Sequence, residues 1–174
     1  GTDLISILAN RMPEDGIPLS QKDFENYFTL LVIAGNETTR HSISHAMLAL
    51  INHPEQLRYL QEDPSRIAGA LEELLRWASP VYHFRRTATR DVELHGKTIR
   101  EGDKVVMWFA SGNRDEDVFP DPYTLDVGRT PNEHYAFGIG PHFCLGANLA
   151  RLEIRVMFEE LLRRLPDMEP DGPV

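Results

Sequence analysis

The single cysteine of this chain, Cys144, lies in a loop rich in glycine and aromatic residues. The loop reads Phe137-Gly138-Ile139-Gly140-Pro141-His142-Phe143-Cys144-Leu145-Gly146. Gly138 and Gly140 allow the backbone to turn tightly and to approach a bulky flat group, and Gly146 keeps the start of the next helix clear of a side chain. A helix that begins beside Cys144 would favour the thiolate through its N–H groups and its dipole.

Three chemical roles compete for such a cysteine. A buried, inert thiol is the common one. A nucleophilic cysteine needs a base, and the seven histidines of the chain make one available, but no nucleophile signature surrounds Cys144. A thiolate ligand to haem iron fits the glycines, the helix dipole and Phe137. A phosphate-binding loop does not fit, because the third glycine and the Lys-Ser/Thr ending are missing.

A second candidate segment interrupts a long apolar helix predicted over about 20–52. Ser20 and Asp23 predict its start, and His53-Pro54 predicts its end. Its centre, Gly35-Asn36-Glu37-Thr38-Thr39-Arg40, is made of poor helix formers directly after the most apolar turn. Local rules are often broken at functional positions, and a tolerated glycine or a helix break is the alternative.

A pair of charged residues stands out in a helix predicted to end near Ala78. The apolar stripe of that helix is Ile67, Leu71, Leu74, Leu75 and Ala78. Glu73 and Arg76 point away from the stripe, and Glu72 is a second acid within reach of Arg76. The simplest expectation is a solvated ion pair worth about 0.3 kcal/mol.

The rest of the pattern predicts a mainly α-helical chain with a small antiparallel β-sheet. Strands are expected around 83–89, 92–94, 98–99 and 104–109, with hairpin turns at 95–97 and 101–103. An irregular stretch over 110–139 follows, of the kind that is functional or held by specific contacts. A last helix is expected over about 145–165, carrying Leu145, Leu149, Leu152 and Val156.

Composition excludes several classes of function. The 174 residues hold 18 Lys plus Arg and 27 Asp plus Glu, so the formal charge of −9 argues against a nucleic-acid binder. One cysteine cannot form an internal disulfide or a Cys-rich metal site. No apolar run approaches the roughly 20 residues that cross a bilayer, so no membrane segment is expected.

Read in order, these motifs resemble the cytochrome P450 family over essentially the whole chain. The Cys loop matches the family's haem-binding signature, and 34–39 matches its distal helix motif. Glu73 and Arg76 match its Glu-x-x-Arg element, with Arg129 where the family places a second arginine. The resemblance implies a mainly α, haem-thiolate fold with a small antiparallel sheet.

The resemblance also implies roles for particular residues. Cys144 would be the proximal thiolate ligand to haem iron. Glu37 and Thr38 would be the acid–alcohol pair that supplies protons for oxygen activation. The other residues implied to contact haem or oxygen are Ala34, Gly35, Arg86, Phe137, Gly138, His142 and Gly146, of which Arg86 and His142 would neutralise the propionates.

Two further sets follow from the same resemblance. Glu73, Arg76 and Arg129 would form a structural network behind the Cys loop. Val81, His83 and Phe84 would line the substrate pocket.

The implied reaction inserts one atom of O2 into a hydrophobic lipid, terpenoid or steroid-like substrate. Ferredoxin and ferredoxin reductase would supply electrons from NAD(P)H, which suits the near-neutral charge over 81–164, and the location would be cytoplasmic as in soluble bacterial members. The alternatives are a non-catalytic or isomerising haem-thiolate protein and, from another class, a cysteine-nucleophile hydrolase.

Members of the family are longer than this chain. The resemblance therefore implies that 1–174 is the C-terminal haem-binding part of a single domain, without the N-terminal helices and the last β-hairpin. The distal helix would then expose apolar surface. We expect the piece alone to be inactive, and either poorly soluble or a weak haem binder.

Overall fold

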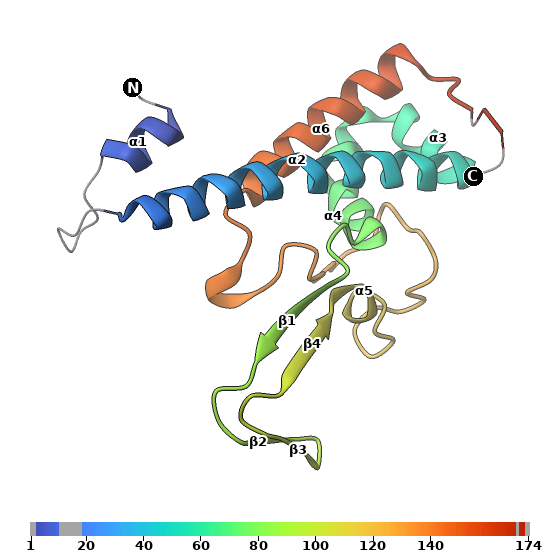
Figure 1. Ribbon diagram of the computed structural model, residues 1–174. Coiled ribbons are helices and arrows are strands. Elements are labelled where there is room, and N and C mark those ends of the chain that lie inside the picture. The colour runs from blue at the N-terminus through green and yellow to red at the C-terminus, as the bar shows by residue number, and fades with distance from the viewer. Residues whose placement is uncertain (1–2, 11–18, 170, 173–174) are drawn as a thin grey trace. The chain divides into compact units, whose positions relative to one another are not determined.

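Helices carry most of the structure, which is a computed structural model (Figure 1). It describes residues 3–10, 19–169 and 171–172. The chain divides into two units, Gly1–Thr38 and Thr39–Val174, and each is described by itself.

The first unit contains α1 (Leu4–Asn10) and the first part of α2 (Gln21–Asn52). The predicted start of α2 is confirmed, because the Asp23 N–H donates to the Ser20 hydroxyl over 3.1 Å and that hydroxyl donates to the Asp23 carboxylate over 2.6 Å. The helix continues without interruption through Gly35, so the helix-break alternative is wrong. Three apolar residues of this part, Leu30, Val32 and Ile33, are exposed, as the resemblance implied.

The second unit packs its helices around one hydrophobic core. The elements are the second part of α2, α3 (Pro54–Glu62), the short 3-10 helix η1 (Pro64–Arg66), α4 (Ile67–Ala78) and α6 (Ala147–Arg164). Helix α4 contacts α6, and α4 buries the predicted stripe Ile67, Leu71, Leu74, Leu75 and Ala78. Ala46 and Leu50 from α2 and Ile154 and Phe158 from α6 complete the centre of the core.

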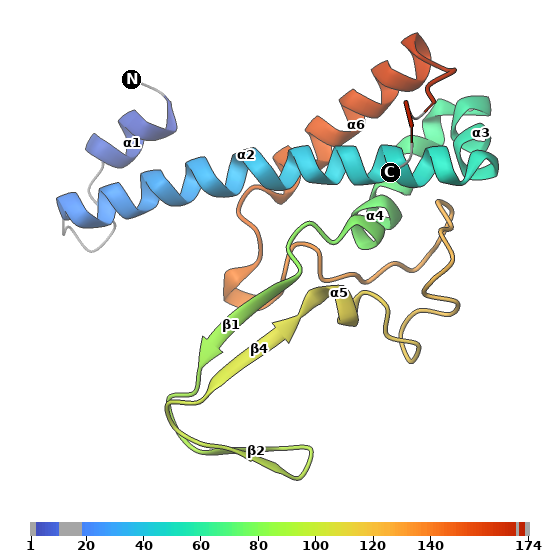
Figure 2. The same ribbon diagram turned by 45° about the vertical axis from the view of Figure 1, so that its right-hand side comes forward.

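The β region forms two separate two-stranded ladders rather than one sheet. Strand β1 (His83–Thr87) pairs antiparallel with β4 (Lys104–Trp108), and β2 (Val92–Leu94) pairs with β3 (Lys97–Ile99). The turn at His95-Gly96 is a hairpin as predicted, with φ of 50° and 72°. The turn at Gly102 is not a hairpin, because it joins strands that pair with different partners. Figures 1 and 2 show the β2–β3 hairpin at the far end of the β1–β4 ladder.

The irregular connection is held in place by buried contacts, as predicted. It begins with α5 (Phe109–Gly112) and continues to the 3-10 helix η2 (Gly140–His142). Phe119, Leu125 and Val127 are buried side chains of this segment. The connection therefore belongs to the core of the second unit, although it has little regular secondary structure.

Helix α6 has two faces that differ in burial. Ile154, Phe158 and Leu162 face the core. The apolar residues that predicted this helix, Leu145, Leu149, Leu152 and Val156, are all exposed. The pattern thus identified the helix correctly, but its spacing marked a face that the described chain leaves uncovered.

Candidate functional site

The Cys loop closes on itself through the backbone. The Cys144 N–H donates to the Phe137 carbonyl over 2.9 Å, and the Phe143 N–H donates to the Gly140 carbonyl over 3.0 Å. The path requires left-handed backbone at Gly138 and Gly140, whose φ angles are 72° and 68°. The two glycines therefore form the tight turns expected of them.

One side of this loop is open. A Cβ placed on Gly140 or Gly146 would meet no described atom within 4 Å. Cys144 is exposed, and the apolar side chains beside it are exposed as well, with Ile139 at 70% and Leu145 at 85%. Exposed apolar surface next to a thiol suits a large, flat, apolar group bound there, so these residues fit a haem.

The position of Cys144 relative to α6 differs from the expectation. Gly146 is the N-cap and the helix begins at Ala147, so Cys144 precedes the first turn. The Cys144 carbonyl accepts the Ala147 N–H over 3.3 Å. Stabilisation of a thiolate by the helix dipole is correspondingly reduced, because that effect is confined to the first turn.

Glu73 and Arg76 are buried, and the expectation of a solvated pair is wrong. Their side chains are 1% and 0% exposed. Arg76 makes a two-pronged contact with Glu73, with distances of 2.7 Å from Nε and 2.8 Å from Nη2. The Arg129 Nε lies 3.2 Å from the same carboxylate, so three residues far apart in the sequence form one network.

Carbonyl groups of the irregular connection accept hydrogen bonds from the Nη nitrogens of both arginines, whereas the buried Arg129 Nε has the ion-pair contact but no hydrogen bond among the described residues. Arg76 Nη1 donates to the carbonyls of Asn113 and Pro122 over 2.7 and 2.9 Å. Arg129 donates to the carbonyls of Pro120, Asp121 and Thr124. The two arginines therefore anchor the connection to α4.

Burial by itself would raise the pKa of Glu73, but its environment holds that pKa below the ordinary value. The opposing causes are the hydrogen bond from Arg76, the N–H of Asp126, and the charges of Arg76 and Arg129. Asn132 also donates to this carboxylate over 2.9 Å. Glu73 is therefore an ionised, fully occupied acceptor, which is the arrangement of a structural network and not of a proton donor.

Glu72 does not pair with Arg76, the partner considered from the sequence. It accepts two hydrogen bonds from Arg151 of α6, over 2.7 and 2.8 Å, and one from the ring of His134 over 3.0 Å. The Arg151 hydrogen bond is the main cause that lowers the pKa of Glu72 to about 2. Neither Arg151 nor His134 stood out in the sequence, since each lies more than 60 residues from Glu72.

Strand β1 divides the predicted pocket residues His83 and Phe84 between its two faces. Alternation puts Phe84 and Arg86 on one face, and the Arg86 guanidinium lies 5.7 Å from the Phe84 ring. His83 is on the other face, 4.7 Å from the Trp108 ring. Val81 precedes the strand and is half-buried. His142 lies in η2 and is exposed.

The predicted oxygen-activating residues lie in the first unit. Ala34, Gly35, Glu37 and Thr38 are consecutive parts of regular α-helix in α2. The Thr38 hydroxyl donates to the Ala34 carbonyl over 2.7 Å, one turn earlier. This bond ties the hydroxyl to the helix backbone beside Gly35.

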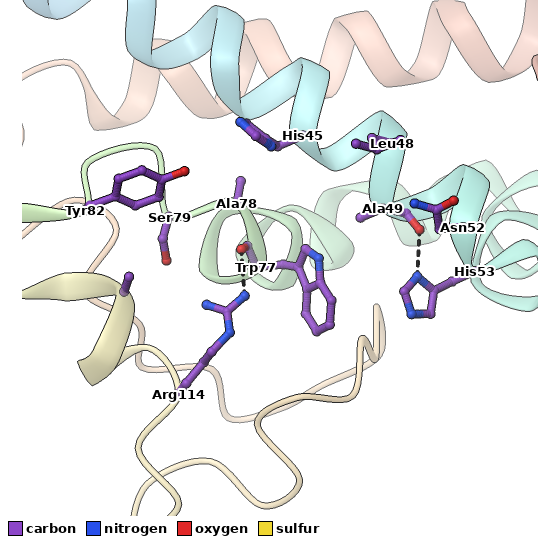
Figure 3. Close-up of a pocket in the computed structure, with 11 residues that line it drawn as sticks. His45, Leu48, Ala49, Asn52, His53, Trp77, Ala78, Ser79, Tyr82 and Arg114 are labelled. Carbon is purple, nitrogen blue, oxygen red and sulfur yellow. Dashed lines mark hydrogen bonds between the residues drawn. The ribbon is translucent and has the colours of Figure 1, made fainter. Parts of the chain in front are cut away.

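A cavity of about 430 Å³ lies in the second unit, between α2, the end of α4 and α5 (Figure 3). Its polar wall includes His45, His53, Tyr82 and Arg114, and Arg114 donates to the Trp77 carbonyl over 3.0 Å. Val81, His83 and Phe84 are not among the residues that line it. The cavity is therefore distinct from the surface on which the sequence predicted a substrate pocket.

The described part of the chain has neither a membrane-spanning helix nor a cluster of metal-ligating side chains. No helix in it is long and apolar enough to cross a membrane. Within the same residues, no three His, Cys, Asp or Glu side chains cluster as metal ligands.

An exposed cysteine on a glycine loop, a buried Glu-x-x-Arg pair and a long apolar helix define a class of haem-thiolate proteins. The family model of cytochrome P450 matches residues 1–166. The chain belongs to the cytochrome P450 family.

Sequence relatives cover nearly all of this chain. It is 53% identical over 156 residues to a methyl-branched lipid omega-hydroxylase of Mycobacterium tuberculosis, covering 88% of the chain and 36% of the relative. It is 46% identical to a linalool 8-monooxygenase of Pseudomonas putida, covering 97% and 41%. The chain thus spans about two-fifths of the length of the curated relatives it matches.

Solved structures agree with the sequence relatives. A Mycobacterium marinum cytochrome P450 in complex with pseudoionone superposes with a TM-score of 0.93 at 52% identity, covering 100% of this chain and 42% of that one. A Bacillus megaterium enzyme in complex with testosterone gives a TM-score of 0.92 at 39% identity, covering 100% and 49%. The fold is therefore an incomplete cytochrome P450 fold, as the motifs implied.

Proposed function

We propose that the complete polypeptide containing this sequence is a haem-thiolate monooxygenase with Cys144 as the protein ligand to iron. The observation that carries this proposal is the exposed Cys144 on a backbone-closed glycine loop with an open apolar side, in a chain of the cytochrome P450 family. Bound haem would supply the binding and reduction of O2.

The chain offers residues suited to hold that group. Gly138 and Gly146 add no side chains to the loop, and the ring of Phe137 lies beside the ring of Phe143 within it. Arg86 and His142 are exposed side chains with donors, which suits the binding of carboxylate groups such as propionates. The Arg86 guanidinium would offset the cost of bringing a carboxylate against an apolar surface.

Glu37 and Thr38 are proposed to deliver protons for oxygen activation. A hydroxyl can accept one hydrogen bond while it donates another, which suits proton delivery, and Ala34-Gly35 presents little side-chain bulk where oxygen would need room. Thr38→Ala is then expected to keep haem binding and to divert electrons from product to hydrogen peroxide. Unchanged coupling of electron consumption to product would remove Thr38 from this role.

The reaction consumes O2, two electrons and two protons, and it yields a hydroxylated product and water. The relatives named for lipid, linalool and steroid oxidation support a small hydrophobic substrate of lipid, terpenoid or steroid type. Val81, His83 and Phe84 are the proposed pocket residues. Measuring substrate-induced spectral shifts with a fatty acid, a terpene and a sterol would identify the class.

Glu73, Arg76 and Arg129 are assigned a structural role, because almost all of their donors and acceptors are engaged with each other and with the connection before the Cys loop. Electron delivery is proposed from a ferredoxin and its reductase in the cytoplasm. The near-neutral segment 81–164 would repel an acidic partner protein less than the rest of this acidic chain does.

The decisive experiment is the absorption spectrum of the complete, haem-loaded polypeptide after reduction and addition of carbon monoxide. We expect the red-shifted Soret band of thiolate ligation, and we expect Cys144→Ser to lose it. A colourless, haem-free protein would contradict the proposal. A thiolate spectrum with no oxygen incorporation from any substrate would favour the isomerising or non-catalytic alternative.

The cysteine-nucleophile alternative has less support. Within the described residues, no hydrogen bond links a histidine to the Cys144 thiol, so the base that a nucleophile needs is not in place. Covalent trapping of Cys144 by an electrophilic ester, together with the absence of haem, would reverse this preference.

A further inference from the structure

A second charged cluster supports the Cys loop, apart from the Glu73 network. It consists of Glu72 on α4, Arg151 on α6 and His134, which lies just before the loop. Arg151 uses Nε and Nη2 on the two oxygens of Glu72, a planar fork that holds both side chains in one orientation. His134 is only 3% exposed and contacts the same carboxylate.

Two hydrogen bonds orient the ring of His134. Its Nδ1 accepts the N–H of Ala136 over 3.1 Å, so the proton is on Nε2, which donates to Glu72. The charges of the cluster are one carboxylate and one guanidinium, which balance each other.

The cluster reaches Cys144 through Phe137. The Arg151 guanidinium lies 4.5 Å from the centre of the Phe137 ring, and the His134 ring lies 6.1 Å from it. The Phe137 carbonyl is the acceptor of the Cys144 N–H. The pKa of Arg151 is raised chiefly by its hydrogen bond with Glu72 and by the charge of Glu72, with a smaller contribution from Cys144.

We propose that Glu72 and Arg151 are positioning residues for Cys144: Glu72 holds Arg151 against the Phe137 ring, and their balanced charges set the electrostatic potential at the sulfur. This inference rests on the proposed function, in which that sulfur binds haem iron. The ion pair Arg155–Glu159 on the same helix shows the contrast, since it is a single contact of 3.6 Å between side chains 45% and 46% exposed.

The test uses the complete haem-loaded polypeptide and measures its reduction potential and its rate of haem loss to a scavenger protein. Arg151→Gln removes a positive charge near the sulfur and is expected to lower the potential. Glu72→Gln leaves Arg151 unbalanced and is expected to raise it. Both variants should lose haem about tenfold faster, the usual effect of removing a group that orients a ligand.

Two controls separate position from charge. Arg155→Gln removes a charge from the exposed pair and should change neither measurement. Arg151→Lys keeps the charge but loses the planar fork, so haem loss should accelerate while the potential stays near that of the unmodified protein.

Shifts of the same sign in Arg151→Gln and Glu72→Gln, or no shift in either, would overturn the inference. If Arg151→Gln does not fold, Glu72→Gln decides alone, because an amide retains the shape of the carboxylate: a raised potential supports the inference and an unchanged one refutes it. An unmodified protein without a thiolate spectrum refutes the proposed function instead, whatever the variants do.

Discussion

The Glu73 network and the Cys loop use opposite arrangements of the same kinds of side chain. The network buries charges with almost every donor and acceptor engaged, and Arg76 is 0% exposed. The Cys loop exposes apolar side chains and a thiol with few contacts to the described chain. Buried charges hold the second unit together, whereas the loop leaves an apolar surface open to a group that is not part of the described residues.

The difference separates residues that determine folding from residues that determine chemistry. Removing one partner of a buried pair leaves an uncompensated charge, which costs several times more than losing an exposed contact. Removing an exposed thiol leaves nothing unsatisfied. Substitutions at the two regions should therefore differ strongly in stability, and the following measurements test that.

The largest effect is expected at the buried pair. Arg76→Ala leaves Glu73 buried without its main partner, and we expect the free energy of unfolding to fall by about 4 kcal/mol. Urea unfolding of the complete polypeptide measures this. Arg163→Ala, which removes an exposed contact with Glu160, is the control and should cost less than about 0.5 kcal/mol. Similar losses in both variants would contradict the contrast.

The next effect is a pH dependence from Glu72. Its pKa in the folded protein is about 2, against an ordinary value of 4.5. The lowered pKa contributes stability that is present above pH 4.5 and is lost as the pH falls toward 2, by about 2 kcal/mol after solvent screening. The free energies of unfolding of the unmodified protein and of Glu72→Gln, measured between these pH values, should become similar at the acid end. Parallel curves would show that Glu72 is not responsible.

A smaller effect is expected within the Cys loop backbone. Gly138 has a φ of 72°, so Gly138→Ala is expected to lower the free energy of unfolding by about 1 kcal/mol. Gly69→Ala is the matched control, because Gly69 lies inside α4 and its added Cβ would meet no described atom within 4 Å. That change should stabilise the protein by about 0.5 kcal/mol. If thermal unfolding shows that Gly138→Ala destabilises the protein and Gly69→Ala stabilises it, strain at Gly138 is confirmed. Stability changes of the same sign in both variants would exclude it.

The smallest effect is expected at the cysteine itself. Cys144 is exposed, so Cys144→Ser should change the free energy of unfolding of the haem-free protein by less than about 0.5 kcal/mol. The same substitution should abolish the thiolate spectrum of the haem-loaded protein. A large loss of stability in the haem-free protein would show that Cys144 contributes to folding. The contrast between the Glu73 network and the Cys loop would then be wrong.

Local patterns predicted the elements well. The start of α2 at Ser20 and Asp23, the stripe of α4 and the hairpin at His95-Gly96 all follow from rules that act over a few residues. The family was also readable from the sequence, because its motifs are short and occur in a fixed order. None of these features depends on which distant segments meet.

Such local rules did not predict the contacts between segments that are distant in the sequence. The pairing of β1 with β4 skips the hairpin between them, and the sequence does not state which strands will pair. Glu72 took Arg151 and His134 as partners instead of Arg76, which was nearer along the chain. The burial of Glu73 and Arg76 likewise depends on the irregular connection that covers them.

The sequence by itself determined the family, the helices and the cysteine loop, because each is encoded by neighbouring residues. Only the tertiary structure decided which charges are buried and which side chains hold the loop. The physical reason is that a charge inside a protein is stable only where donors and acceptors from remote segments converge on it, and convergence is a property of the folded chain.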